Sequence, residues 1–277
     1  MRLRYPKWLH VWLSCTALFA TSAPSSALAT GSPLTATKPW DLDYGETQCT
    51  ALREYRGPNG PVTLAIVPAP NGGSYALLVT YKGKFSRFAE ESAGSVIFAS
   101  SPITAWALKY GIGDLTLYQF RLSSTDMLHA ISAPTVTIQA KGGFDITFAL
   151  DNMRDLIGGL QKCTADLQDY WNAGGEKNGR IAVPSRGEIR YDFSASDYPR
   201  EALNRRQSGT SQYLLLVDEK GSVAGCHVLR ASGVPALDAM GCLVIRERSK
   251  LTPAKDASGK PVRSTYVTPP VVWRIAF

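Results

Sequence analysis

Histidine is rare in this sequence, and the common signatures of hydrolytic enzymes are missing from it. Three of the 277 residues are histidines, and no G-x-S-x-G, S-x-x-K or H-E-x-x-H pattern occurs. Cys226 precedes His227, but neighbours in a strand point to opposite faces, which argues against a Cys–His nucleophile pair. We therefore expect a non-enzymatic protein with no catalytic residues, no cofactor and no metal site.

Long apolar runs are absent after residue 30, so we expect no stable membrane insertion of the mature protein. Before that point, three basic residues precede a mostly apolar run over residues 8–20, and small residues end in Ala27-Leu28-Ala29. This pattern predicts a cleaved secretory signal peptide over residues 1–29. The mature protein is then periplasmic or secreted. An uncleaved anchor and a lipid on Cys15 are the alternatives.

A concentrated basic stripe, the usual mark of nucleic-acid binding, is missing too. The 30 Lys and Arg against 23 Asp and Glu give a net charge of +7, and loss of the three basic residues in the signal peptide lowers it to +4. Arg200, Arg205 and Arg206 come closest to a cluster and suit a solvated helix face. We expect no nucleic-acid partner.

Four of the five cysteines lie beyond the signal peptide: Cys49, Cys163, Cys226 and Cys242. An even number in an oxidising compartment predicts two disulfides, and none of the spacings is the C-x-x-C of a zinc site. Four cysteines allow three pairings. Pairing within domains favours Cys49–Cys163 and Cys226–Cys242.

The composition predicts two domains of an α+β protein. Residues 173–186 are rich in glycine and charge and resemble a linker. They separate a β-rich domain, residues 30–172, from a smaller domain, residues 187–277. An enzyme or small-ligand binder acting through residues 30–172 is the alternative function, and a concave pocket with converging polar groups there favours it.

The β-rich domain begins with strands and ends with a helix. Val62–Val67 and Tyr75–Tyr81 flank an Asn-Gly-Gly turn and predict a hairpin. Apolar residues at intervals of three and four between Leu150 and Leu167 predict a closing helix, with Cys163 on its buried side. Further strands are expected at Ser95–Ala99, Leu115–Leu122, Thr135–Ala140 and Phe144–Phe148, and a short helix at Thr125–Ile131.

The smaller domain follows the order helix, strand, strand, helix, strand. We expect a helix capped by Asp197, strands at Gln212–Asp218 and Val223–Leu229, a helix at Val234–Arg248, and a last strand at Tyr266–Phe277. Pro269-Pro270 cannot donate to a sheet ladder, so the last strand lies at an edge or bends there. This is a two-helix, three-strand antiparallel domain.

Six short motifs occur in this domain in a fixed order. They are Tyr198-Pro199-x-x-Ala202, Gly209, Val217-Asp218-x-x-Gly221, Ser232-Gly233 with Leu237-Asp238, Pro253-Ala254 and Gly259-Lys260-Pro261-Val262. In this order, over about residues 186–277, they resemble the TonB C-terminal domain family. Energy-transducing members of that family carry a membrane helix and a long proline-rich spacer, and this chain has a signal peptide and a globular block in their place.

The resemblance implies binding of an envelope protein by strand pairing at an exposed sheet edge. An outer-membrane transporter is one candidate partner, and self-pairing into a homodimer is another. The expected partner-binding residues are Tyr266, Val267, Val271, Val272 and Trp273, or the segment Ile189 to Phe193. For Trp273, packing in the core is the competing expectation. Trp106 and Trp171 are expected to pack in the core, and stacking on a ligand is their alternative role.

Overall fold

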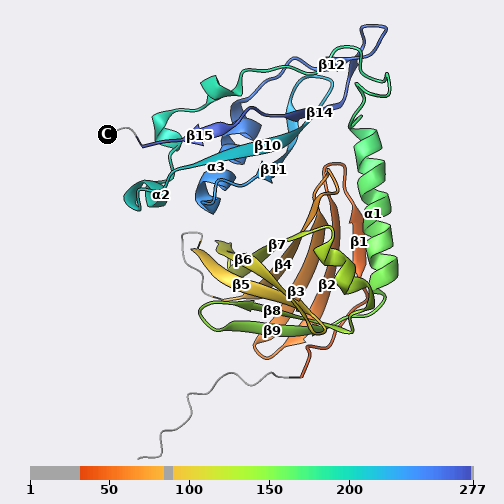
Figure 1. The fold of residues 1–277 in the computed structure, drawn as a ribbon, viewed down its shortest axis with the longest axis vertical. Coiled ribbons are helices and arrows are strands. Elements are labelled where there is room, and N and C mark those ends of the chain that lie inside the picture. Colours follow the sequence, from red (N-terminus) through yellow and green to blue (C-terminus); the bar gives the residue numbers. More distant parts are fainter. Residues whose placement is uncertain (1–31, 84–89, 276–277) are drawn as a thin grey trace, which may run out of the picture.

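The computed structural model describes residues 32–83 and 90–275. The predicted signal peptide, Cys15 and the last two residues of the chain lie outside these ranges. The described chain forms a nine-stranded sheet followed by a helix, and then a four-stranded sheet with a helix on one face (Figure 1). Among the described residues, no helix combines the length and apolar character needed to cross a bilayer.

The nine-stranded sheet is antiparallel and strongly curled. Its order is β1-β2-β3-β4-β7-β6-β5-β8-β9. The strands are β1 (Asp41–Tyr44), β2 (Cys49–Gly57), β3 (Gly60–Pro68), β4 (Ser74–Lys82), β5 (Glu90–Phe98), β6 (Ser101–Ile112), β7 (Leu115–Ser123), β8 (Thr135–Ala140) and β9 (Phe144–Ala149). The β3–β4 hairpin and the strands β5, β7, β8 and β9 were expected, whereas β2 and β6 were not.

Residues 34–37 close this sheet into a barrel. Leu34 donates to the carbonyl of Thr147 in β9 at 2.8 Å, and Thr37 donates to the carbonyl of Glu54 in β2 at 2.9 Å. β1 pairs with the first half of β2, so residues 34–37 pair with its second half. We call β1–β9 together with residues 34–37 the barrel.

Large apolar side chains fill the barrel. Every second residue of β2, β3 and β4 is buried, as expected for strands with one apolar face. Tyr55, Phe120 and Phe148 are among the largest fully buried side chains, and Tyr55 packs edge-on against Phe148. The buried Arg53 is neutralised by a bidentate ion pair with Asp151, at 2.6 and 2.9 Å.

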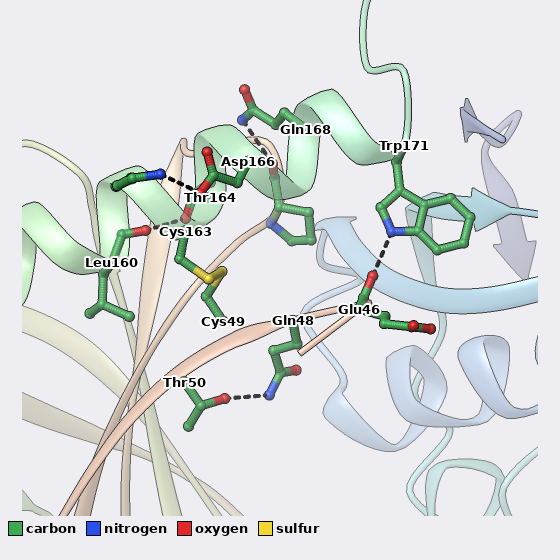
Figure 2. The surroundings of a disulfide bond; sticks show 12 residues. Glu46, Gln48, Cys49, Thr50, Leu160, Cys163, Thr164, Asp166, Gln168 and Trp171 are labelled. Atoms are coloured by element: carbon green, nitrogen blue, oxygen red, sulfur yellow. Dashed lines mark hydrogen bonds and ion pairs between the residues drawn. A yellow bond between two sulfur atoms is a disulfide. The ribbon is translucent and has the colours of Figure 1, made fainter. Parts of the chain in front are cut away.

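Helix α1 (Met153–Tyr170) packs beside β1 and β2 and buries the apolar stripe expected from the sequence. A disulfide joins Cys163 of α1 to Cys49 of β2 (Figure 2). Gly159 lets the helix approach β1 closely, because a Cβ there would lie 2.8 Å from Cδ2 of Leu42. A short 3-10 helix, η1 (Asp126–Ser132), also contacts α1.

The second sheet is built around β10. β11 pairs with one side of β10, and β14 and β15 share the other side. The elements are α2 (Arg200–Asn204), β10 (Gly209–Val217), β11 (Val223–Arg230), α3 (Pro235–Arg248), β12 (Ala254–Lys255), β13 (Pro261–Val262), β14 (Ser264–Val267) and β15 (Val271–Trp273). The single last strand expected from the sequence is thus two short strands, separated at Pro269-Pro270.

Helix α3 covers one face of this sheet. Tyr213, Leu215 and Val217 of β10 are buried with Ile245 in one apolar cluster. A second disulfide, Cys226–Cys242, joins β11 to α3, so both disulfides have the pairing that the sequence favoured. Asp197 does not cap α2. It closes a capping box with Ser194 in the 3-10 helix η3 (Ala195–Asp197) that precedes it.

Residues 173–186 make more contacts than the expected linker would. Ile181 and Ser185 are buried. Val183 donates to the carbonyl of Lys255 at 3.0 Å, and Arg186 donates to the carbonyl of Thr252 at 3.1 Å. This segment therefore packs along residues 252–255, next to the separate two-stranded sheet formed by β12 and β13.

Candidate partner-binding edge

A groove of about 580 Å³ runs along β15. One wall is formed by residues 269–274, and the other by residues within 187–198. We call this space the groove. It brings together the two segments that the sequence offered as alternatives for partner binding, the last strand and the segment from Ile189 to Phe193.

The edge formed by β14 and β15 is open on the side away from β10. Among the strands of the described chain, β10 is the only one that pairs with either of them. Thr268, next to β14, donates its N–H to the carbonyl of Tyr213 at 2.9 Å. Along an antiparallel strand the N–H groups alternate in direction, so that of Val267 points outward.

The same alternation applies to β15. Tyr213 of β10 faces Thr268, so Ser211 and Gly209 turn their backbone groups toward β15, and Thr210 turns away. Val272 pairs with Thr210, and its N–H therefore points outward as well. The side chains of Val267 and Val272 are 49% and 50% exposed. These two residues offer unpaired main-chain groups to a partner.

The other predicted residues face inward. Trp273 is 5% exposed and packs edge-on against Phe193 and Tyr198, with ring centroids 5.5 and 5.6 Å away. Val271 packs against the same apolar cluster, and the hydroxyl of Tyr266 donates to the carbonyl of Gly187 at 3.1 Å. These three residues therefore hold the groove wall formed by residues within 187–198 against the edge.

The segment from Ile189 to Phe193 is not a strand. Residues Ile189–Asp192 form a 3-10 helix, η2, in which Ile189 is buried and Tyr191 is exposed. The guanidinium of Arg190 lies over the Tyr191 ring at 4.5 Å and pairs with Glu188 at 3.2 Å. Ile189, Arg190 and Phe193 of this segment line the groove, so it lies beside the β15 edge without being a strand of the sheet.

The wall opposite β15 is fixed by Asp197. Its two carboxylate oxygens each accept from Arg248 of α3 at 2.7 Å. Arg248 also donates to the carbonyl of Asp192 at 3.1 Å. These bonds, together with donors from Ser194, hold the pKa of Asp197 well below its usual range.

Cys226 is consumed in a disulfide, and within residues 32–83 and 90–275 no group of three or more His, Cys, Asp or Glu side chains is placed to hold a metal ion.

Trp171 is buried, as expected, but Trp106 is 69% exposed, so the expectation that it packs in the core was wrong. Trp106 lies on β6 and alternates with the buried Ala105 and Ala107, which places its ring on the outside of the barrel.

Comparison with known proteins bears on the second sheet. Residues 194–275 match the family model described as Gram-negative bacterial TonB protein C-terminal. Searches of curated proteins and of solved structures gave no match. The match includes α2, α3 and all four strands of the second sheet, and it confirms the resemblance predicted from the sequence. Residues 194–275 of this chain are therefore similar to the TonB C-terminal domain family.

Proposed function

We propose that this protein is a non-enzymatic interaction protein of the bacterial cell envelope, linked to outer-membrane transport. Its TonB-like domain binds an extended segment of a partner, which adds as a strand to the edge formed by β14 and β15. The observation that carries this proposal is the open edge beside the groove, in a domain that matches the TonB family.

The shape of the edge favours binding through the main chain. Val267 and Val272 turn N–H groups outward, and a partner strand pairs with such groups irrespective of its side chains. The groove leaves room beside β15 for the partner's own side chains. Because Pro269 and Pro270 have no N–H, they interrupt the edge between the two donors.

The proposal includes the division of the chain into domains. Residues 30–172 form the barrel domain and residues 187–277 the TonB-like domain, exported by a signal peptide over residues 1–29 into the periplasm. The partner is an outer-membrane transporter or another periplasmic protein. Self-pairing of two edges into a homodimer is the competing assembly.

Ligand binding or catalysis through the barrel is the second candidate. The interior is occupied by side chains such as Tyr55, Phe120 and Phe148, which leaves this alternative with less support. The groove of about 580 Å³ is lined by residues of the TonB-like domain alone.

The test is photo-crosslinking in intact cells. A photoreactive amino acid at Ala195, which is exposed and lines the groove, is expected to capture an envelope partner at an extended segment. Val272→Pro removes an outward N–H and is expected to abolish the adduct. Val272→Ala keeps the N–H and is the matched control, expected to retain it. Equal adduct yields from folded Val272→Pro and Val272→Ala proteins would contradict strand addition at β15.

A further inference from the structure

The second face of the TonB-like sheet, opposite α3, is covered by the barrel and α1. Leu214 and Leu216 of β10 point to this face and are 8% and 1% exposed. Leu216 belongs to the same buried apolar cluster as the barrel core and α1, and Ala224 of β11 packs against that cluster. Figure 1 shows β10 and β11 facing the end of the barrel.

Polar contacts fix this docking. Asn172, after the end of α1, donates to the carbonyl of Arg263 at 2.8 Å. The guanidinium of Arg263 lies 4.1 Å from the centre of the Tyr170 ring. On the other side, Arg121 of β7 donates to the carbonyl of Val228 in β11 at 3.2 Å. Trp171, just after α1, holds the turn between β1 and β2 in place, because its indole N–H donates to the backbone carbonyl of Glu46 (Figure 2).

His227 lies on the same face. It pairs in register with Leu214, and a Cβ at Gly225 would lie 3.4 Å from its Nε2. The backbone of Thr47, in the turn between β1 and β2, lies close enough to the ring to act on its pKa. The Nε2 of His227 is buried and has no hydrogen-bond partner among the residues that the structure describes. A second proton on this ring would have to sit in the interface with nothing to accept it.

We propose that Leu214, Leu216 and His227 form an acid-releasable docking surface, from which protonation of His227 detaches the barrel. The cleft of about 290 Å³ at this interface is lined by Leu214 and by Thr265 of β14, so docking also covers one side of the β14 edge. Release would widen access to that edge. This inference rests on the proposed two-domain division and not on partner binding.

The direction of the pH effect on docking depends on which state of the protein binds the proton more tightly. Burial lowers the pKa of His227 from 6.5 to about 4; the backbone of Thr47 opposes this shift, and Arg246 of α3 adds to it. The undocked state therefore takes up the proton first as pH falls. Docking is unaffected above pH 6.5 and weakens about tenfold per pH unit below it, by on the order of 100-fold at pH 4.

Other charged groups at the interface act differently. Burial raises the pKa of Asp238 in α3, and partial desolvation beside Asp238 raises that of Glu91 in β5, so protonation of either favours the docked state. Arg121 stays charged. Glu46 flanks Thr47 in the turn, and its carbonyl is already bonded to Trp171. Substitution of His227 is therefore needed to separate its effect on the pH dependence of docking from that of the acidic groups.

The experiment measures transient opening in the full chain. Leu214→Cys places a thiol in the interface, and its reaction with 4,4′-dithiodipyridine is followed from pH 7.5 to 4, with the label located by mass spectrometry. The same substitution is made together with His227→Gln, which is neutral at every pH. The ratio of the two rates cancels the chemistry of the thiol and the effect of Glu91 and Asp238.

We expect this ratio to be constant above pH 6.5 and to rise by on the order of 100-fold between pH 6.5 and 4. His227→Lys is expected to label fast already at pH 7.5. His227→Leu is the second neutral variant, should the amide disturb packing. Near-ultraviolet circular dichroism checks that both domains stay folded. A ratio that stays flat with pH, or slow labelling of His227→Lys, overturns the proposal. The measurement needs no partner, so it is independent of whether the β14–β15 edge binds one.

Discussion

Gly241 of α3 lies directly against the hydroxyl of Tyr213 in β10: a Cβ at Gly241 would meet that oxygen at 1.9 Å. Tyr213 is fully buried, its hydroxyl is within 2.7 Å of the Ser211 hydroxyl, and burial raises its pKa to about 12. The phenol cannot swing away without breaking a buried hydrogen bond. The glycine therefore sets how closely α3 approaches the sheet.

We expect Gly241→Ala to destabilise the TonB-like domain by about 1–3 kcal/mol, as overpacking does, in spite of the better helix propensity of alanine. Gly158→Ala in α1 is the matched control, because a Cβ there meets nothing within 4 Å, and it is expected to be neutral or to stabilise by up to about 1 kcal/mol. Urea denaturation followed by Trp fluorescence measures both. Equal transition midpoints for the two variants would show that α3 and Tyr213 can move apart without loss of stability.

The two disulfides are expected to differ in their effect on stability. Cys49–Cys163 closes a sequence separation of 114 residues and Cys226–Cys242 one of 16. In the chain-entropy model the longer loop is worth about 5 kcal/mol and the shorter about 3 kcal/mol. Replacing each pair by alanine and measuring denaturant midpoints checks this order. A larger loss from the shorter loop would mean that local packing, and not chain entropy, sets the contribution.

The ion pair between Asp197 and Arg248 predicts an acid-sensitive contribution to stability. The pKa of Asp197 is lowered in the folded protein, so the stabilisation is complete above the unfolded value of about 3.9 and is lost as pH falls below it. Asp197→Asn is expected to flatten the fall in melting temperature between pH 4 and 2. Asp166→Asn, from an exposed i,i+4 pair with Lys162, is the control and should leave that slope unchanged.

The signal peptide remains a prediction that protein chemistry can check. Small residues at Ala27 and Ala29 fit cleavage after Ala29, which leaves Thr30 as the new amino terminus. Leu34 is bonded to β9, so a terminus at Thr30 keeps the segment that closes the barrel. N-terminal sequencing of the exported protein measures the site. Cleavage beyond Leu34, or a lipid on Cys15, contradicts this expectation.

Patterns that depend on local chemistry were predictable, and those that depend on long-range pairing were not. The apolar stripe of α1 and the Asn-Gly-Gly hairpin follow from period and turn chemistry, and both appear in the structure. β2 escaped prediction because its inward positions include Arg53, whose burial is made possible by Asp151, 98 residues away. Closure of the barrel by residues 34–37 likewise cannot be predicted from neighbouring residues, because it depends on pairing with the distant strands β2 and β9.

The position of the sheet edge was predictable from the sequence, whereas the residues that face outward along it were not. Proline marked the sheet edge, and the family motifs marked the domain. Which residues face outward depends on the hydrogen bond between Thr268 and Tyr213, which sets the alternation along β14. The valines of β14 and β15 do not by themselves predict that register. Nothing in the sequence around His227 predicts its burial, because it lies on the sheet face that the barrel covers.

The last prediction tests the division into two domains through Leu216. In the full chain this side chain is buried against the barrel cluster, so Leu216→Ala should cost about 2–5 kcal/mol, as in a protein core. In a fragment of residues 181–277, which keeps the contacts of Val183 with Lys255, the barrel is absent and Leu216 faces solvent. The same substitution should then change stability by less than about 1 kcal/mol and improve solubility, because it removes an exposed apolar side chain. Leu215→Ala is the control: Leu215 faces α3, and its truncation should be costly in both proteins. Thermal and urea melts of the four variants and their parents provide the measurement. If the oxidised fragment melts without cooperativity, the TonB-like domain depends on the barrel for its fold. If Leu216→Ala is as costly in the fragment as in the full chain, Leu216 is a core residue of the TonB-like domain, and the docking face must be drawn elsewhere.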